Sequence, residues 1–156
     1  MTALDGFHDH TYPPNLTTMM LTNDLITPDN VSKDLLKAIY DAAFIETAWD
    51  DDGDLKIKDE LNCTVMISEN QTRIMIFTVF EFEEGFSREQ KLDLVNKIND
   101  EYAFVRASLT EYDTLLFDYS FYLKGGLTKK NLVLGTRFFQ SIPLEAIHEH
   151  GKEMVA

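Results

Sequence analysis

The residues with the clearest potential for chemistry are the four carboxylates of a short acidic run, Asp50-Asp51-Asp52-Gly53-Asp54. Oxygen ligands grouped around a glycine are typical of a calcium-binding loop. When Gly53 is placed at the obligatory glycine of that loop, Ala48 occupies the first ligand position and Asp59 occupies the position of the bidentate Glu. The flanking segments also alternate as strands and not as helices. We therefore predict a hairpin turn here and no calcium site.

Two His-x-His pairs, His8/His10 and His148/His150, offer nitrogen ligands for a metal ion. Residues at i and i+2 share a face on a strand but diverge on a helix, and the second pair lies in a segment with helical spacing. A metal site would also need both ends of the chain to meet and a third ligand. We expect surface histidines, and neither a metal nor another cofactor.

The remaining candidates for catalysis are the carboxylates of Asp113 and Asp118 and the single thiol, Cys63. An acid–base pair needs two carboxyl groups in different environments of one pocket, and no spacing in the sequence fixes such a pair. Cys63 lies in an alternating strand pattern, whereas all four histidines lie near the chain ends, so we expect a buried apolar residue. Nucleotide-binding, hydrolase and zinc patterns do not occur. The sequence predicts a protein that is not an enzyme.

The charge of the chain limits the partners it can bind. A net charge of −13 at pH 7 repels phosphate backbones and anionic lipid surfaces, so nucleic acid and membranes are poor partners. No run approaches the length of a membrane span, and the first residues lack the basic and apolar regions of a signal peptide. We expect a cytoplasmic protein.

The stretch from Thr72 to Phe82 is the segment around which the other elements must be arranged. It is rich in β-branched and aromatic residues and contains neither Gly nor Pro, which predicts a strand. One side of that strand carries Ile74, Ile76 and Phe80, which we expect under the helices. The other side carries Arg73, Met75, Phe77, Val79 and Glu81. Both faces are apolar at the centre, so the strand needs cover on both sides.

The rest of the chain predicts helices and strands in a simple order. We expect residues 1–24 to form a flexible arm before a single domain, residues 25–156, although the apolar segment Leu16–Ile26 could instead pack on the domain or on a neighbour. Helices are expected to begin at Thr27-Pro28, at a capping box from Ser87 to Gln90, and at Thr128, with Pro143 interrupting the last. Strands are expected at 45–49, 55–58, 62–67, 72–82, 104–110 and 115–123.

These elements indicate an α+β fold with an antiparallel sheet and helices on one face, because short turns join the strands. The first helix is expected to end near Phe44. Its apolar residue Leu35, together with Leu94 and Phe138 of the other helices, is expected to cover Phe80.

Five segments of the chain carry a family resemblance: Leu25–Val31, Asp50–Asp54, Asn96–Asn99, Tyr102–Arg106 and Gly125–Leu132. Together, over about residues 25–142, they resemble the bacterial YbjN-like family, whose members are described as sensory transduction regulators. The family tends to close its first helix with a Gly–aromatic pair, where this chain has Ala43-Phe44. The resemblance implies the fold of type III secretion chaperones, with the order α-β-β-β-α-β-β-α, frequent dimers and no catalytic residues. The residues themselves indicate one more strand, 45–49, before the second helix, unless that segment only leads into the sheet.

The first functional hypothesis is a non-enzymatic bacterial protein that binds other polypeptides in a chaperone-like or regulatory role. We expect its interaction surface to be the second face of the central strand, formed by Arg73, Met75, Phe77, Val79 and Glu81, and covered by a second copy or by a protein or peptide partner. The alternative is a domain that senses a small molecule bound between sheet and helices.

Overall fold

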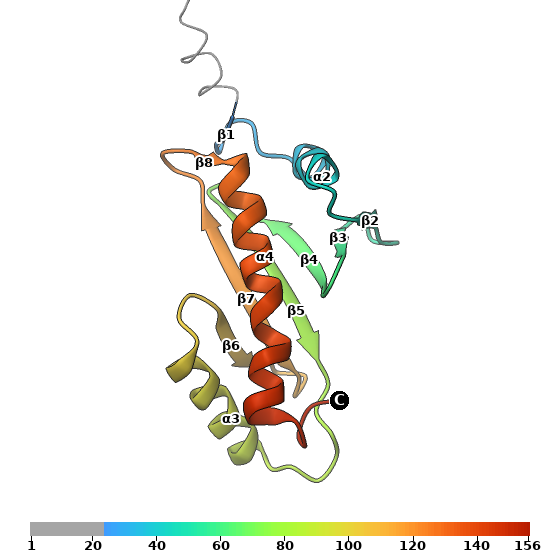
Figure 1. The fold of residues 1–156 in the computed structure, drawn as a ribbon, viewed down its shortest axis with the longest axis vertical. Coiled ribbons are helices and arrows are strands. Elements are labelled where there is room, and N and C mark those ends of the chain that lie inside the picture. The colour runs from blue at the N-terminus through green and yellow to red at the C-terminus, as the bar shows by residue number, and fades with distance from the viewer. Residues whose placement is uncertain (1–23) are drawn as a thin grey trace, which may run out of the picture.

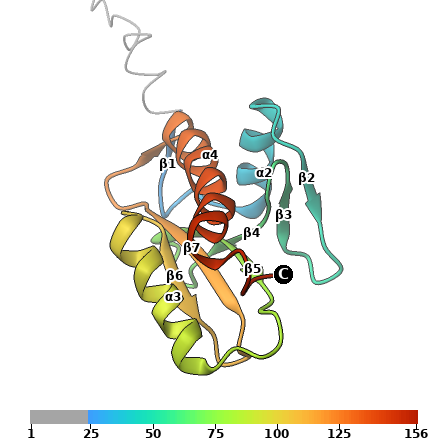
Figure 2. The same ribbon diagram turned by 60° about the horizontal axis from the view of Figure 1, so that its bottom comes forward.

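The computed structural model describes residues 24–156, so the expected flexible arm lies outside the described residues except for Asp24. A six-stranded antiparallel sheet in the order β2-β3-β4-β5-β7-β6 forms one layer, and the helices lie across one of its faces (Figure 1; Figure 2). The strands are β1 (Leu25–Ile26), β2 (Thr47–Trp49), β3 (Leu55–Lys58), β4 (Asn62–Ile67), β5 (Arg73–Phe80), β6 (Arg106–Leu109), β7 (Leu115–Tyr122) and β8 (Leu127–Thr128). The helices are α2 (Lys33–Ala42), α3 (Arg88–Glu101), α4 (Lys129–Ala146) and the π-helical turn η1 (Ile147–Gly151). The predicted α+β fold, with an antiparallel sheet and helices on one face, is confirmed.

The central position of β5 follows from its sequence, because both of its faces are apolar. It pairs antiparallel with β4 on one side and with β7 on the other. Ile74 and Ile76 are fully buried beneath the helices, as predicted, while Phe80 is only half-buried and meets the ring of Phe117 edge to face. The prediction that Phe138 covers Phe80 is wrong, because Phe138 is 41% exposed and the neighbouring Phe139 enters the core instead.

The strand count agrees with the pattern read from the residues. Four strands of the six-stranded sheet precede α3, because Thr47–Trp49 pairs with β3 as a short edge strand, whereas the layout implied by the resemblance has three. A second, two-stranded sheet joins β1 to β8 and was not predicted. A strand of only two residues is too short to show the alternation of apolar and polar side chains from which strands are predicted.

The first helix begins five residues later than predicted. Ser32 is the N-cap of α2, and its hydroxyl accepts a hydrogen bond from the backbone N–H of Leu35 at 3.1 Å. The Thr27-Pro28 segment forms a turn instead, because the Asn30 side chain accepts from the Thr27 N–H at 2.8 Å and donates to the Leu25 carbonyl at 2.9 Å. A polar side chain that binds nearby backbone groups competes with helix formation in this way.

The other predicted helix starts are confirmed. Ser87 and Gln90 form the reciprocal capping box at the start of α3, and the Thr128 hydroxyl caps α4. The predicted interruption at Pro143 is wrong, because α4 continues to Ala146 and is followed by a π-helical turn that ends at Gly151.

Helix α4 lies unusually close to β7 at Gly135. A β-carbon at this position would lie 2.5 Å from a ring carbon of Phe121, a separation that real side chains do not reach. Gly135 is therefore required for the contact between helix and sheet, even though glycine weakens the interior of a helix.

We expect Gly135→Ala to lower the free energy of unfolding by about 1–2 kcal/mol, because the clash with Phe121 outweighs the gain of about 1 kcal/mol in helix propensity. Urea unfolding measures this change. The matched control is Ser141→Ala, at an exposed position of the same helix, which should not destabilise the protein by as much. A more stable Gly135→Ala protein would contradict the close packing.

The acidic run forms the predicted hairpin turn between β2 and β3. The backbone pairs Trp49 with Leu55, and Gly53 takes a φ of +76°. The Asp50 carboxylate accepts hydrogen bonds from the backbone N–H groups of Asp54 at 2.7 Å and Asp52 at 3.1 Å, and pairs with Lys56 at 3.0 Å. These contacts hold the pKa of Asp50 below its usual value, the backbone bond from Asp54 contributing most.

Asp50→Ala should lower the melting temperature at pH 7, whereas Asp51→Ala, in the exposed part of the same turn, should change it little. Because the folded-state pKa of Asp50 is depressed, the stabilisation is present above the ordinary pKa of 3.8 and is lost as the pH falls through the lower folded value. Melting curves from pH 7 to pH 2 should therefore converge for the wild-type and Asp50→Ala proteins. A difference that stays constant with pH would contradict this role.

Candidate interaction surfaces

The predicted interaction residues lie on the face of the sheet that points away from the helices. Arg73, Met75, Phe77 and Val79 alternate along β5 with the buried residues of the inner face, whereas Glu81 follows the end of the strand, where its carbonyl accepts a bond from the Ala156 N–H at 3.0 Å. Met75 and Phe77 are half-buried and Val79 is 45% exposed. Within residues 24–156, no helix covers this face (Figure 1; Figure 2).

The register adds apolar side chains from neighbouring strands that the sequence did not identify. Met66 lies opposite Met75, Leu116 opposite Val79, and Tyr122 opposite Arg73. The alternation of β7 contained a signal, because Leu116 and Tyr122 share a side with Asp118 and Ser120. We define the outer sheet patch as Met66, Met75, Phe77, Val79, Leu116 and Tyr122.

Polar side chains flank the centre of this patch in one cross-strand row. On one side of Phe77, Lys56 donates to the Thr64 hydroxyl at 2.7 Å. On the other side, Arg106 holds the Asp118 carboxylate with two nitrogens at 2.8 Å. Asp118 is 5% exposed although it lies on the outer face, so Arg106 supplies the charge that stabilises its buried carboxylate.

We expect Arg106→Ala to cost about 1–2 kcal/mol of stability, because it leaves the Asp118 carboxylate buried without its cation. Chemical denaturation measures the loss, and Asp118→Asn in the same background should recover most of it. Arg73→Ala is the control, since the described residues provide Arg73 with no carboxylate partner. Equal effects of the two arginine substitutions would argue against a special role for the pair.

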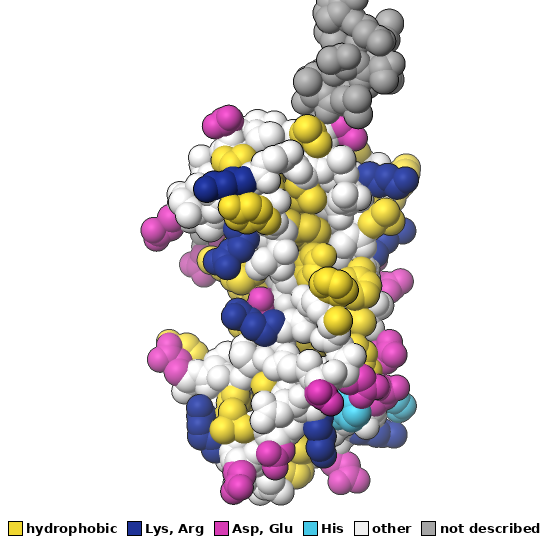
Figure 3. All heavy atoms as spheres, turned by 90° about the vertical axis from the view of Figure 1, so that its left-hand side faces the viewer, with side chains coloured by type: hydrophobic (Ala, Val, Ile, Leu, Met, Phe, Trp, Pro, Cys, Tyr) yellow, Lys and Arg dark blue, Asp and Glu magenta, His cyan; other side chains and the backbone are white. Residues whose placement is uncertain are grey.

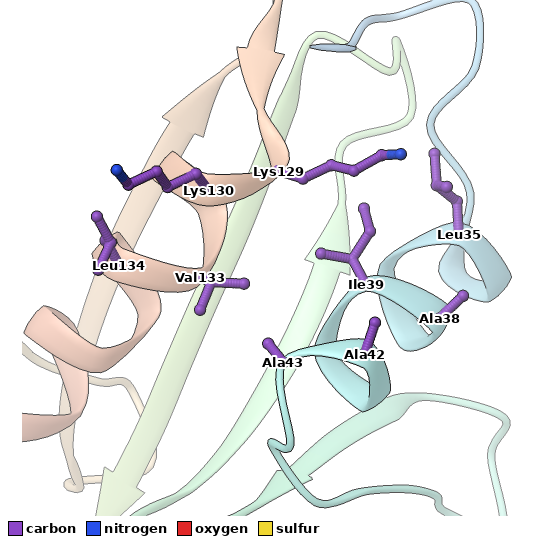
Figure 4. A pocket seen from close by; sticks show the side chains of 9 residues that line it. All are labelled: Leu35, Ala38, Ile39, Ala42, Ala43, Lys129, Lys130, Val133 and Leu134. Atoms are coloured by element: carbon purple, nitrogen blue, oxygen red, sulfur yellow. The ribbon is translucent and has the colours of Figure 1, made fainter. Parts of the chain in front are cut away.

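A second candidate surface is an apolar groove of about 450 Å³ between α2 and α4. Figure 4 shows Ile39 and Ala42 of α2 and the following Ala43 on one side and Val133 of α4 on the other, with Lys129 reaching over one end toward Leu35. The remaining lining residues are Ala38, Lys130 and Leu134. Small alanines on one wall leave the space open. We call this surface the α2–α4 groove. It depends on the packing of two helices that are far apart in the sequence, so no local sequence pattern indicated it.

Exposed apolar side chains continue from the groove along α4. Leu134 is 53% exposed and Phe138 is 41% exposed. Figure 3 shows hydrophobic side chains gathered along one side of the molecule, with basic groups at both ends and acidic and histidine side chains near the lower end. A contiguous apolar surface of this kind is typical of a binding site.

Phe44 directly follows Ala43, which lines the groove, but itself borders a separate hollow with Arg137 and Gln140. It follows α2 in the left-handed conformation, with φ of +60°, and its side chain is 95% exposed. Glycine is the usual residue at this position of a helix end, so both the backbone conformation and the exposed ring are unfavourable. Arg137 donates to the Ala43 carbonyl beside it at 3.4 Å. At Ala43-Phe44 the chain lacks the Gly–aromatic pair of the family that it resembles, and a strained, exposed aromatic residue therefore lies next to an apolar groove.

The two histidines of the second His-x-His pair have different surroundings in the structure. His148 is exposed, while His150 pairs with Glu101 at 2.5 Å and Tyr102 donates to Glu149 at 2.7 Å. The hydrogen bond to Glu149 is the main cause of a raised Tyr102 pKa, and burial and other carboxylates add to it. Glu101, Glu149 and His150 place one donor atom each within 4.8 Å of the others. The arrangement is an exposed hydrogen-bonded cluster that ties the end of α3 to η1.

Other candidates for chemistry lie apart from one another. Cys63 is buried, 3% exposed, and burial raises the pKa of its thiol to about 12, so it remains an unreactive thiol at neutral pH. Asp113, in the loop between β6 and β7, pairs with Lys91 of α3, whereas Asp118 lies on β7 and pairs with Arg106. The helices of residues 24–156 include none that is long and apolar enough to cross a membrane.

Known proteins share the sequence pattern and the fold of this chain. The sequence profile of the YbjN family, described as "Putative bacterial sensory transduction regulator", matches residues 32–149. A crystal structure of YbjN from E. coli, described as "a putative transcription regulator", is similar with a TM-score of 0.68 and 15% identity, over 81% of this chain and 96% of that chain. A chain of the HopA1-SchA chaperone–effector complex is similar with a TM-score of 0.52 and 16% identity, over 77% and 92%. A search of curated proteins found no match.

Proposed function

We propose that this chain, which belongs to the YbjN family, is a non-enzymatic protein that binds other polypeptides in a regulatory or chaperone-like role through the outer sheet patch. The observation that carries the proposal is a sheet face with apolar side chains at its centre and no covering layer among residues 24–156. Apolar side chains on an exposed face favour association with a further surface.

The distribution of side chains on this face supports a protein partner. Phe77 and Met75 form an apolar centre, and the charged side chains of Lys56, Arg106 and Arg73 surround it. An apolar centre with a polar rim is the usual composition of a protein–protein interface. A chain of the HopA1-SchA chaperone–effector complex, which is an assembly of polypeptides, has a similar fold. A polypeptide is therefore the class of partner that we propose for this chain.

The simplest such partner is a second copy, and we infer a homodimer that buries the outer sheet patch of both chains. A symmetric dimer would place the same apolar side chains against each other. Sedimentation at high micromolar concentration should then give twice the 17.9 kDa mass of the chain. A single species at the monomer mass would contradict the dimer but leave a separate polypeptide partner possible. We further infer a cytoplasmic location, and the net charge of −13 supports the exclusion of nucleic acid and membrane partners.

We expect Phe77→Glu and Val79→Glu to abolish association while leaving a folded protein, because each places a carboxylate in the apolar centre of the patch. Light scattering measures the mass, and circular dichroism checks the fold. Leu92→Glu is the matched control, because Leu92 is 42% exposed on α3 and Val79 is 45% exposed on β5. Loss of association in the Leu92 variant alone would place the interface on the helical side instead.

A small-molecule sensor is the second candidate function. The expectation placed its ligand between sheet and helices, where the described residues form the buried hydrophobic core, and the α2–α4 groove is an apolar hollow on the helical side. A volume of about 450 Å³ is within the range of small-molecule sites. Native mass spectrometry of the purified protein should detect a retained ligand if this function is correct.

A further inference from the structure

We infer that the α2–α4 groove is the docking site for residues Leu16–Leu21 of the same chain. The groove is apolar, open and bordered by lysines, and the chain leading to Leu16–Leu21 leaves the described structure at its edge. This surface lies on the helical side of the molecule, so the inference is independent of the proposed function of the outer sheet patch.

The position of Asp24 brings the segment within reach. The Asp24 carbonyl accepts a hydrogen bond from the backbone N–H of Lys129 at 3.1 Å, and Lys129 lines the groove. Leu21 and Leu16 stand three and eight positions before Asp24, so they reach at most about 10 Å and 26 Å from it. Helix α2, with ten residues, is about 15 Å long. The full length of the groove is therefore accessible.

The side chains of the segment match those of the groove. Leu16, Met19 and Met20 stand at i, i+3 and i+4, the spacing that presents one apolar face to a groove between helices. Methionine adapts its shape to irregular apolar surfaces, here the alanines of α2 and Val133 of α4.

The segment also brings no positive charge to the groove, because residues 1–23 contain no lysine or arginine. The end of the groove nearest Asp24 carries Lys129 and Lys130. Because the segment and groove belong to one chain, the effective concentration is of millimolar order, so a weak apolar contact is enough to keep the groove occupied.

Disulfide trapping in the full-length chain tests the inference. The protein carries Met19→Cys with Leu134→Cys on the groove wall, and the matched control carries Met19→Cys with Leu144→Cys. Leu134 and Leu144 are 53% and 50% exposed on the same helix, so both variants should fold. The native Cys63 is 3% exposed and will not compete. Under mild oxidation by diamide, the Leu134→Cys pair should close within one chain at least about tenfold faster than the control pair.

Equal rates for the two pairs would overturn the inference. A disulfide between two chains, seen as a doubled mass without reducing agent, would also overturn it, because the groove would then hold the segment of a second copy. The second measurement is hydrogen exchange of the α2 and α4 amides. Met19→Asp with Met20→Asp should speed exchange at the groove, whereas the control Thr17→Asp with Thr18→Asp should not; unchanged exchange in the first variant would contradict docking.

Discussion

The fold depends on the close packing of α4 against the sheet at Gly135. The absence of a side chain there lets the helix backbone approach the ring of Phe121, and this approach sets the depth at which the rest of α4 lies. The next residue, Thr136, shares a hydrogen bond of 3.0 Å with the buried Tyr40 hydroxyl of α2, and about one turn further Gln140 donates to the Leu61 carbonyl at 3.0 Å. These buried polar groups need their partners, because an unpaired one would cost about 1–3 kcal/mol. A shift of α4 would therefore break several contacts at once.

This packing determines which surfaces remain free to bind. The inner face of the sheet is filled by the helices, and Tyr40, Phe117 and Phe139 are fully buried between them. Within residues 24–156, the surfaces left uncovered are the opposite face of the sheet and the outer side of the helices. The outer sheet patch is an apolar area on the first of these sides, and the α2–α4 groove is one on the second. Helix α4 takes part in both arrangements, because it covers the inner face of the sheet, which leaves the outer face exposed, and it forms one wall of the groove.

The sequence predicted best those features that local chemistry determines. Alternation identified β5, the Ser87–Gln90 pattern identified the start of α3, and the Asp-Gly turn identified the hairpin. Other features depend on distant residues and could not be predicted. The register placed Met66 and Tyr122 on the outer sheet patch, and a rotation of about 100° between neighbouring helical positions put Phe139 rather than Phe138 in the core. The start of α2 was wrong because the Asn30 side chain stabilises a turn.

The distribution of basic residues connects the two surfaces. The chain has 27 acidic and only 14 basic residues, yet the basic ones are not spread evenly. Lys56, Lys58, Arg73 and Arg106 lie on or beside the outer sheet patch, and Lys129, Lys130 and Arg137 border the α2–α4 groove. Half of the positive charge of a strongly acidic protein therefore surrounds its two exposed apolar surfaces. On the outer sheet patch, Lys56 and Arg106 are already paired with Asp50 and Asp118, so the apolar centre of the patch is bordered by ion pairs as well as by the unpaired charge of Arg73 among the described residues.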